Sequence, residues 1–251
     1  MTVRTIESRQ NPEIKTVYSL RKSATRKKLQ TFIAEGAKVC LTLFQEGATL
    51  KTCYVTAEKW DTISDTIPEN NICIVPEPVM QKISQAKTPS GILATFEIPK
   101  QPAKEKIETG IVLLDLNDPG NVGTLIRTAT AMNCSTVILV NGVDPWSFKV
   151  VQSSAGYITN VNIFQLSWAE LVSESDAQKL VRTALVVQSG KKPTDINNKN
   201  SLLIIGSESH GIPKELLLDC PEQITLPMPG QTESLNASVA GSIALYLLHN
   251  E

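Results

Sequence analysis

Polar side chains follow a buried strand that the sequence predicts over residues 111–114, in a turn that leads into a helix. Residues 115–129 read DLNDPGNVGTLIRTA. Asn121 can cap the helix, and Arg127 lies about two turns further along it. Because ligands of open parallel sheets gather beyond the carboxyl ends of the strands, both side chains can meet one there. Taken singly, each residue is better explained by a structural role, so it is the dense combination that marks a candidate site.

A second apolar strand, predicted over 202–205, ends in a glycine-flanked loop with one carboxylate and one imidazole. Gly206 suits either a close approach of backbone to a ligand or a simple turn. Glu208 could orient a partner or hold a polar substrate. His210 has no acid or second ligand at the spacing of a metal site, so we interpret it as an ordinary loop residue. The loop is therefore a candidate for binding and not for metal coordination.

A third segment, residues 224–240, reads ITLPMPGQTESLNASVA. Its two prolines and its glycine force irregular backbone, whose amide and carbonyl groups need partners. An adenine edge is one suitable partner. Ser234 or Asn236 can cap the last helix while presenting a polar group to a ligand. Apolar walls for such a ligand can come from Leu226, Met228 and Leu235.

Several familiar motifs are missing from the sequence. It has no Gly-x-Gly-x-x-Gly fingerprint, no phosphate loop ending in Gly-Lys-Ser/Thr and no Gly-x-Ser-x-Gly elbow. The five cysteines are widely spaced and form no Cys-x-x-Cys pair, which argues against a disulfide framework or a zinc site and for reduced, buried thiols. No apolar stretch reaches the ~20 residues that cross a bilayer. We therefore expect a cytoplasmic protein that is not a classical dinucleotide enzyme, an NTPase or an α/β-hydrolase.

The pattern after residue 110 predicts a mostly parallel α/β sheet covered by helices on both faces, because continuous apolar strands alternate with helical segments. The last segment, 236–248, is apolar nearly all round, so it must be buried in a core or against another subunit. Residues 1–98 predict a small α/β domain, and 99–109 a linker. The strands are predicted over 31–34, 50–55, 72–75, 91–98, 111–114, 136–140, 161–166, 184–187, 202–205 and 224–226.

Charge is distributed unevenly along the chain. The net charge is −1, from 24 basic and 25 acidic residues. Residues 1–40 hold nine basic and three acidic side chains, 9 − 3 = +6, which leaves −7 for the remainder. Charge alone favours a solvated helix face, but local positive charge also attracts phosphate. The basic residues predicted to contact nucleic acid are Arg21, Arg26, Lys27 and Lys28.

Together the three segments resemble the signature motifs of the SpoU (TrmH) family of RNA ribose 2′-O-methyltransferases, in the SPOUT superfamily. Their order and spacing match across most of residues 111–248. The phrases NPEIK at 11–15 and FIAEG at 32–36 look like the substrate-binding domain of that family's ribosomal-RNA branch. The resemblance implies a substrate RNA-binding domain over 1–98 and a SPOUT methyltransferase domain over 110–251.

The resemblance also implies a C-terminal trefoil knot, a homodimer with its site at the subunit junction, and S-adenosylmethionine as cofactor, released as S-adenosylhomocysteine. Asn121 and Arg127 match the first motif's substrate and catalytic residues, and Glu208 matches the second motif's acid. Ser234 and Asn236 match the third motif's polar pair. The cofactor-contacting positions are Gly206, Leu226, Met228, Ser234, Leu235 and Asn236. Ser207 and Ser209-His210 depart from the residues more usual in the second motif.

The chemistry of the transfer restricts what Arg127 can do. A ribose hydroxyl must lose its proton as it attacks the methyl group, and a guanidinium stays protonated and is a poor base. Arg127 is better suited to stabilise the developing alkoxide and to grip an adjacent phosphate, which could then accept the proton. In-line positioning would supply the rest of the rate. A non-catalytic RNA-binding protein, a tRNA methyltransferase, and a methyltransferase of proteins or small molecules stay open, as do the target nucleotide and the choice between housekeeping and antibiotic resistance.

Overall fold

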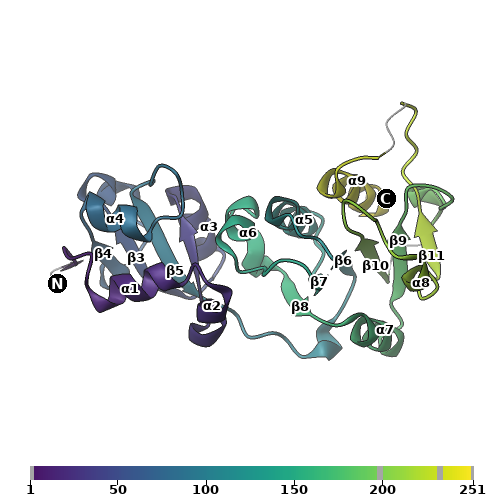
Figure 1. Ribbon diagram of the computed structural model, residues 1–251, viewed down its shortest axis with the longest axis horizontal. Coiled ribbons are helices and arrows are strands. Elements are labelled where there is room, and N and C mark those ends of the chain that lie inside the picture. The colour runs from purple at the N-terminus through teal and green to yellow at the C-terminus, as the bar shows by residue number, and fades with distance from the viewer. Residues whose placement is uncertain (1–2, 197–199, 231–233, 250–251) are drawn as a thin grey trace. The chain divides into compact units, whose positions relative to one another are not determined.

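The computed structural model describes residues 3–196, 200–230 and 234–249 (Figure 1). The chain divides into two compact units. The first unit consists of residues 1–100 and 144–159, and the second unit of residues 101–143 and 160–251. The second unit carries the three motif segments, and the first unit carries most of the basic N-terminal residues.

The first unit is built on a five-stranded mixed sheet in the order β1-β4-β3-β5-β2. Strand β5 runs antiparallel to β2 and β3, and β4 runs parallel to β1 and β3. A small α/β domain is thus confirmed for this part of the chain. The strands are β1 (Arg4–Thr5), β2 (Thr31–Glu35), β3 (Leu50–Val55), β4 (Ile72–Ile74) and β5 (Ile92–Glu97).

Local sequence explains where the first helix of this unit begins and which face it buries. Asn11 caps α1 (Pro12–Ser19) by accepting a hydrogen bond from the Glu13 amide at 2.8 Å, and Pro12 at the first helical position needs no such bond. Ile14 and Val17 are buried in one cluster with side chains of α4 (Glu77–Ile83). The unit also contains α2 (Ser23–Leu29) and α3 (Ala37–Gln45).

Residues 144–159 belong to the first unit although the sequence places them between strands of the second. They include α6 (Phe148–Ser153), whose Phe148 packs against the first unit's core. Gln152 Nε2 donates to the Glu35 carbonyl at 2.9 Å, and the Trp146 ring lies 5.0 Å from that of Phe32. Such long-range contacts leave no periodic signal in the sequence. The limits predicted from the sequence, 1–98, 99–109 and 110–251, stay a prediction.

The second unit is a six-stranded sheet in the order β11-β9-β10-β6-β7-β8, with every strand pair parallel. The predicted parallel α/β class is confirmed. All residues of β6, β7 and β10 are buried, which explains their continuous apolar runs. The strands are β6 (Gly110–Leu114), β7 (Thr136–Val140), β8 (Asn162–Gln165), β9 (Val181–Leu185), β10 (Ser201–Ile205) and β11 (Glu222–Ile224). The trefoil knot stays a prediction.

Strand β9 begins earlier than the sequence predicts, at Val181 and not at residue 184. The first half of β9 is polar, but its polar side chains find hydrogen-bond partners within the second unit. Arg182 Nε donates to the Asp219 carbonyl at 2.6 Å, and the Thr183 hydroxyl lies 2.8 Å from that of Ser201. The apolar pattern alone could not reveal this pairing. In consequence Val186 and Val187, predicted to be strand residues, lie beyond the carboxyl end of β9.

The helices of the second unit are α5 (Pro119–Ala131), α7 (Trp168–Ala177), α8 (Lys214–Leu217) and α9 (Ala237–His249). Helices α5 and α9 pack together, and Thr128 Oγ1 lies 3.0 Å from Ser242 Oγ. Gly241 makes this packing close, because a Cβ there would lie 2.7 Å from Leu125 Cδ2. A second face of α9 stays exposed and is formed by Val239, Ile243 and Tyr246.

The five cysteines are all free and buried, as predicted. Burial raises the pKa of the Cys53 thiol to about 12 and that of the Cys134 thiol to about 11, so both stay protonated at neutral pH. Among the described residues, no helix combines the length and the apolar character that crossing a membrane requires.

Candidate active site

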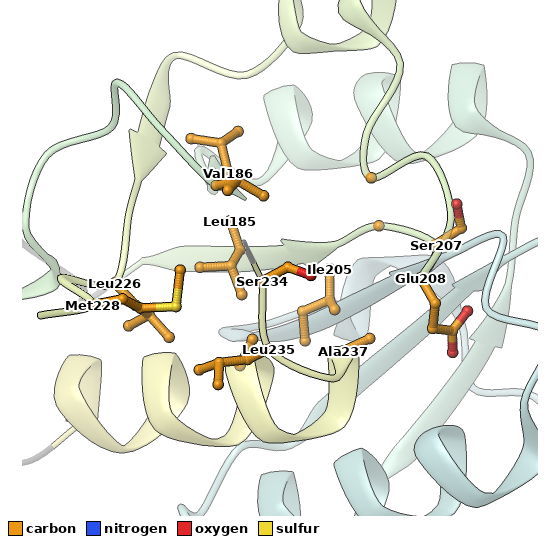
Figure 2. Close-up of a pocket in the computed structure, with 14 residues that line it drawn as sticks. Leu185, Val186, Ile205, Ser207, Glu208, Leu226, Met228, Ser234, Leu235 and Ala237 are labelled. Atoms are coloured by element: carbon orange, nitrogen blue, oxygen red, sulfur yellow. The ribbon is translucent and has the colours of Figure 1, made fainter. Parts of the chain in front are cut away.

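A pocket opens beyond the carboxyl ends of β9 and β10 and receives residues from the second and third motif segments (Figure 2). Its walls are mostly apolar, with hydroxyl and carboxylate groups of Ser207, Glu208 and Ser234. In Figure 2, Leu226 and Met228 lie at one end and Ser207 and Glu208 at the other. The remaining lining residues are Leu185, Val186, Val187, Ile205, Gly206, Gly211, Leu235, Ala237 and Ala240.

Gly206 permits the loop of the second motif to fold back on itself. A Cβ at Gly206 would lie 2.4 Å from the carbonyl carbon of Gly211, closer than any side chain can approach backbone. The Gly211 amide donates to the Ser207 carbonyl at 2.9 Å, and Gly211 has a φ of +64°. Both glycines are thus required by the fold of this loop. The fold of the loop in turn fixes the backbone position of Glu208.

The first and second motifs are joined by one side-chain hydrogen bond. Asn121 Nδ2 donates to Glu208 Oε1 at 2.7 Å, and Asn121 is only 8% exposed. The sequence-based expectation that Asn121 caps α5 is wrong. Asp118 is the cap, because its Oδ1 accepts from the Asn121 amide at 2.8 Å and Pro119 occupies the first helical position. The Asn121 side chain is therefore left to hold Glu208 at the rim of the pocket.

In the third motif, Asn236 does cap α9, as predicted. Its Oδ1 accepts hydrogen bonds from the amide and the hydroxyl of Ser238, at 2.9 and 2.7 Å. Among the described residues of this motif, Ser234 and Leu235 line the pocket and Asn236 does not. The predicted contact of Asn236 with a cofactor therefore stays a prediction. Residues 231–233 of this motif lie outside the described residues.

Arg127 lies on α5, is exposed and does not line the described pocket of its own chain. It is six residues beyond Asn121, about 9 Å along the helix axis. Within the described part of the chain, Arg127 makes no hydrogen bond or ion pair, and it does not pair with Asp118. A guanidinium without a partner in this part of the chain is available to meet a ligand or a second subunit.

Sequence reasoning missed several residues of the pocket. Val186 and Val187 enter it because β9 lies next to β10, so the segment after β9 reaches the same edge of the sheet. Ala237 and Ala240 enter it from the first turn of α9. Only the order of the strands could have identified the valines. The alanines could have been found from their small size next to the third motif.

The four predicted RNA-binding residues do not share one environment. Arg21, Lys27 and Lys28 are exposed, but Arg26 is only 5% exposed. Arg26 Nη2 lies 2.6 Å from Asp144 Oδ2, and Nη1 donates to the carbonyls of Leu20 and Arg21. The prediction that Arg26 contacts RNA is wrong, because its guanidinium is buried and is engaged in hydrogen bonds within the first unit.

Asp144 is the anionic partner in this buried pair. Burial alone would raise the pKa of the Asp144 carboxyl. Hydrogen bonds from Ser23, Arg26 and the Trp146 amide outweigh that effect and hold the pKa below its ordinary value. The pair is therefore charged at neutral pH and contributes to the stability of the first unit.

Comparisons with known proteins agree with this architecture. The model of the SpoU rRNA Methylase family matches residues 108–246, and that of the MRM3-like substrate binding domain matches residues 11–94. The 23S rRNA (guanosine(2553)-2′-O)-methyltransferase RlmP of Bacillus subtilis is 29% identical over 249 residues, 97% of this chain and 98% of the relative. An uncharacterized tRNA/rRNA methyltransferase of Synechocystis is 30% identical, over 97% of this chain and 93% of the relative.

A solved structure matches nearly the whole length of the chain. The AdoMet-bound rRNA methyltransferase from Sinorhizobium meliloti superposes with a TM-score of 0.85 at 25% identity, covering 98% of this chain and 97% of that chain. These matches, together with the parallel sheet and the substrate-binding domain before it, identify a methyltransferase of the SPOUT type. The chain belongs to the SpoU rRNA methylase family, and the family predicted from the three motifs is confirmed.

Proposed function

We propose that this protein transfers the methyl group of S-adenosylmethionine to a ribose 2′-hydroxyl of ribosomal RNA. The observation that carries the proposal is the pocket at the edge of the parallel sheet, with the Asn121–Glu208 bond joining the first motif to its rim. RlmP of Bacillus subtilis, which is named for ribosomal RNA, is matched over 98% of its length, and the substrate-binding domain model matches residues 11–94 of this chain. A cytoplasmic location is part of this proposal.

The residues of the pocket fit this cofactor. Apolar side chains of Leu226, Leu235 and Ala240 offer walls for an adenine ring, and the irregular backbone after β11 offers amide and carbonyl groups for its edge. Ser207 and Ser234 supply hydroxyl groups for a ribose or an amino-acid moiety. When bound, the cofactor supplies an electrophilic methyl group. Everything else in the transfer depends on how the chain holds the RNA.

Arg127 is the residue proposed to act on the ribose. Its guanidinium would grip the phosphate next to the target nucleotide and stabilise the negative charge that develops on the 2′-oxygen. The proton of the hydroxyl would pass to that phosphate, since guanidinium itself stays protonated. Glu208, fixed by Asn121, would hold the nucleotide or the cofactor at the rim of the pocket.

We also propose a homodimer in which each pocket is completed by Arg127 of the partner subunit. Val239, Ile243 and Tyr246 follow one another at helical spacings of four and three, and each is more than 40% exposed. An exposed apolar helix face of this kind favours a protein interface. Helix α5, which packs against α9, carries Arg127 outside its own chain's pocket. Dimerisation would therefore bring Arg127 of the partner subunit to a pocket that Arg127 of the same chain does not line.

The experiment that tests the function is a map of 2′-O-methylation across total RNA, with and without the gene. Loss of one mark in ribosomal RNA, restored by the purified protein and S-adenosylmethionine, is the expected result. Loss of a mark in transfer RNA would show that the substrate is transfer RNA and not ribosomal RNA. No lost mark, with methyl transfer to a protein or small molecule, would replace the proposed reaction. No lost mark and no cofactor binding would leave a non-catalytic RNA-binding protein.

A further inference from the structure

One exposed aromatic side chain of the first unit lies among cations and has no role in the core. Tyr18, near the end of α1, is 45% exposed. The guanidinium carbon of Arg21 lies 4.4 Å from the centre of the Tyr18 ring, and Lys82 Nζ lies 6.0 Å from it. The Tyr18 ring is thus only partly used in packing, and the remainder of it faces solvent beside these cations.

The surroundings hold the Tyr18–Arg21 pair in place. Arg21 Nη2 donates to the carbonyl oxygens of Lys82 and Ser84, at the end of α4, where helix carbonyls attract a cation. Lys82 Nζ donates to the Arg9 carbonyl at 2.6 Å. Within the described chain, Nε and Nη1 of Arg21 make no hydrogen bond. The pair is thus fixed from one side, and two nitrogens of Arg21 keep their N–H groups for a ligand.

The charge around this pair is positive. Arg9 and Lys15 are exposed, and Lys15 lies one helical turn before Tyr18 on α1. The acid on the same helix, Glu13, is already engaged, because it bonds bidentately to Arg4 and accepts from the Tyr54 hydroxyl. The field of this surface therefore attracts anions.

We propose that Tyr18 and Arg21 form a stacking platform for one unpaired nucleobase of the substrate RNA, and that the surrounding cations hold its flanking phosphates. This proposal rests on the proposed function. A flat aromatic–guanidinium pair offers a surface to any base, and base–aromatic stacking is the usual means of holding single-stranded RNA. Arg9, Lys15 and Lys82 supply the positive charge that tracks a phosphate backbone. Duplex RNA keeps its bases stacked inside and cannot use such a platform.

The test compares Tyr18→Ala with Tyr18→Phe in the full-length protein. The probe is ribosomal RNA extracted from a strain without this gene, with poly(U) or an RNA duplex as competitor. Tyr18→Ala should bind this RNA at least about tenfold more weakly, whereas Tyr18→Phe keeps the ring and should stay within about twofold of wild type. Poly(U) should displace the RNA more readily than the duplex does, and Tyr18→Ala should lose that difference. Lys59→Gln, an exposed lysine of the same unit, serves as the charge control.

Separate readouts distinguish this proposal from the proposed function. Cofactor affinity and the methyl-transfer rate at saturating RNA should be unchanged in Tyr18→Ala, because only recognition is altered. Wild-type affinity of Tyr18→Ala, equal weakening by Tyr18→Phe, or equal competition by duplex and poly(U) would overturn the platform. Arg21→Lys, which keeps the charge and loses the planar group, should weaken binding more than Lys59→Gln does. A wild-type protein that methylates no RNA would overturn the function and leave the binding result intact.

Discussion

Asn121 Nδ2 and Glu208 Oε1 are 2.7 Å apart, and this bond connects the helix of the first motif with the loop of the second. The two residues are 87 positions apart in the sequence. Each comes after a buried parallel strand, β6 or β10, and these two strands are neighbours in the sheet. The bond therefore fixes the acid at the rim of the pocket relative to the helix that carries Arg127.

Reversing the two side chains tests whether this bond matters. Asn121→Asp places two carboxylates in contact and should slow methyl transfer about tenfold or more, less so at acid pH, where protonation removes the repulsion. Adding Glu208→Gln to Asn121→Asp restores a donor and an acceptor with their positions exchanged. The double variant should regain much of the rate in a single-turnover assay. A double variant no faster than Asn121→Asp would show that the bond itself is not used.

Gly206 should tolerate no side chain, because a Cβ at this position would lie 2.4 Å from the Gly211 carbonyl carbon. Gly206→Ala should weaken cofactor binding at least about tenfold in calorimetry, since the loop must open to admit the alanine methyl group. Gly230→Ala, with no described atom within 4 Å of its Cβ, is the matched control in the third motif and should bind normally. Leu235→Asp should also lose binding without unfolding, because Leu235 is a partly exposed wall of the pocket. Normal binding by both Gly206→Ala and Leu235→Asp would show that the cofactor binds outside this pocket.

Among the basic residues of α2, Arg26 should affect the stability of the protein, whereas Lys27 and Lys28 should affect RNA binding. Lys27→Gln with Lys28→Gln should weaken RNA binding and flatten its salt dependence, because fewer counterions are released, while the melting temperature stays unchanged. Arg26→Gln should destabilise the first unit by about 3 kcal/mol or more, because Asp144 is left without its buried partner. Titration of the salt dependence and thermal unfolding give the two readouts. Unchanged stability of Arg26→Gln would contradict the role of the buried pair.

The same pair predicts a dependence of stability on pH. The pKa of Asp144 is lower in the folded protein than its ordinary value of 3.8. Its contribution to stability is therefore fully present above that value and is lost as the pH falls through the folded pKa. Acid unfolding of wild type and Arg26→Gln should converge at low pH. Curves that stay parallel down to acid unfolding would contradict this linkage.

The exposed face of α9 should make the dimer. Wild type should sediment at twice 27.4 kDa at micromolar concentration. Ile243→Asp with Tyr246→Asp should give monomers, because two charges would be buried in an apolar interface. Leu218→Asp is the matched control, since Leu218 is 87% exposed and lies outside α9. A monomeric wild type, or a doubly substituted protein that still dimerises, would contradict this interface.

Some of the site could be read from the sequence. Continuous apolar strands place the residues after 114 and 205 at the same edge of a parallel sheet, and the cap role of Asn236 follows from its position before α9. Pro119 was a usable signal that Asp118, and not Asn121, is the cap of α5. What could not be read depends on contacts distant in sequence. The burial of Arg26 needs Asp144, 118 residues away, and the entry of Val186 into the pocket needs the pairing of β9 with β10.

Arg127 gives the most direct test of the central claim, which is that a guanidinium from α5 stabilises the transition state. Arg127→Ala should fold, dimerise and bind S-adenosylmethionine, because Arg127 is exposed and makes no hydrogen bond or ion pair within the described chain. Arg127→Lys should have little more activity than Arg127→Ala, since an ammonium cannot form the planar two-point contact of a guanidinium. Mixing Arg127→Ala with Leu235→Asp subunits should restore activity, because one mixed pocket then has both an intact wall and an intact arginine from the other subunit.

The deciding measurement is the single-turnover rate of methyl transfer by Arg127→Ala at saturating RNA and cofactor. The proposed role predicts a fall of at least ~10²-fold, the usual scale for losing one preorganised electrostatic contact. A rate near that of wild type would contradict the mechanism, while the membership in the SpoU family would stand.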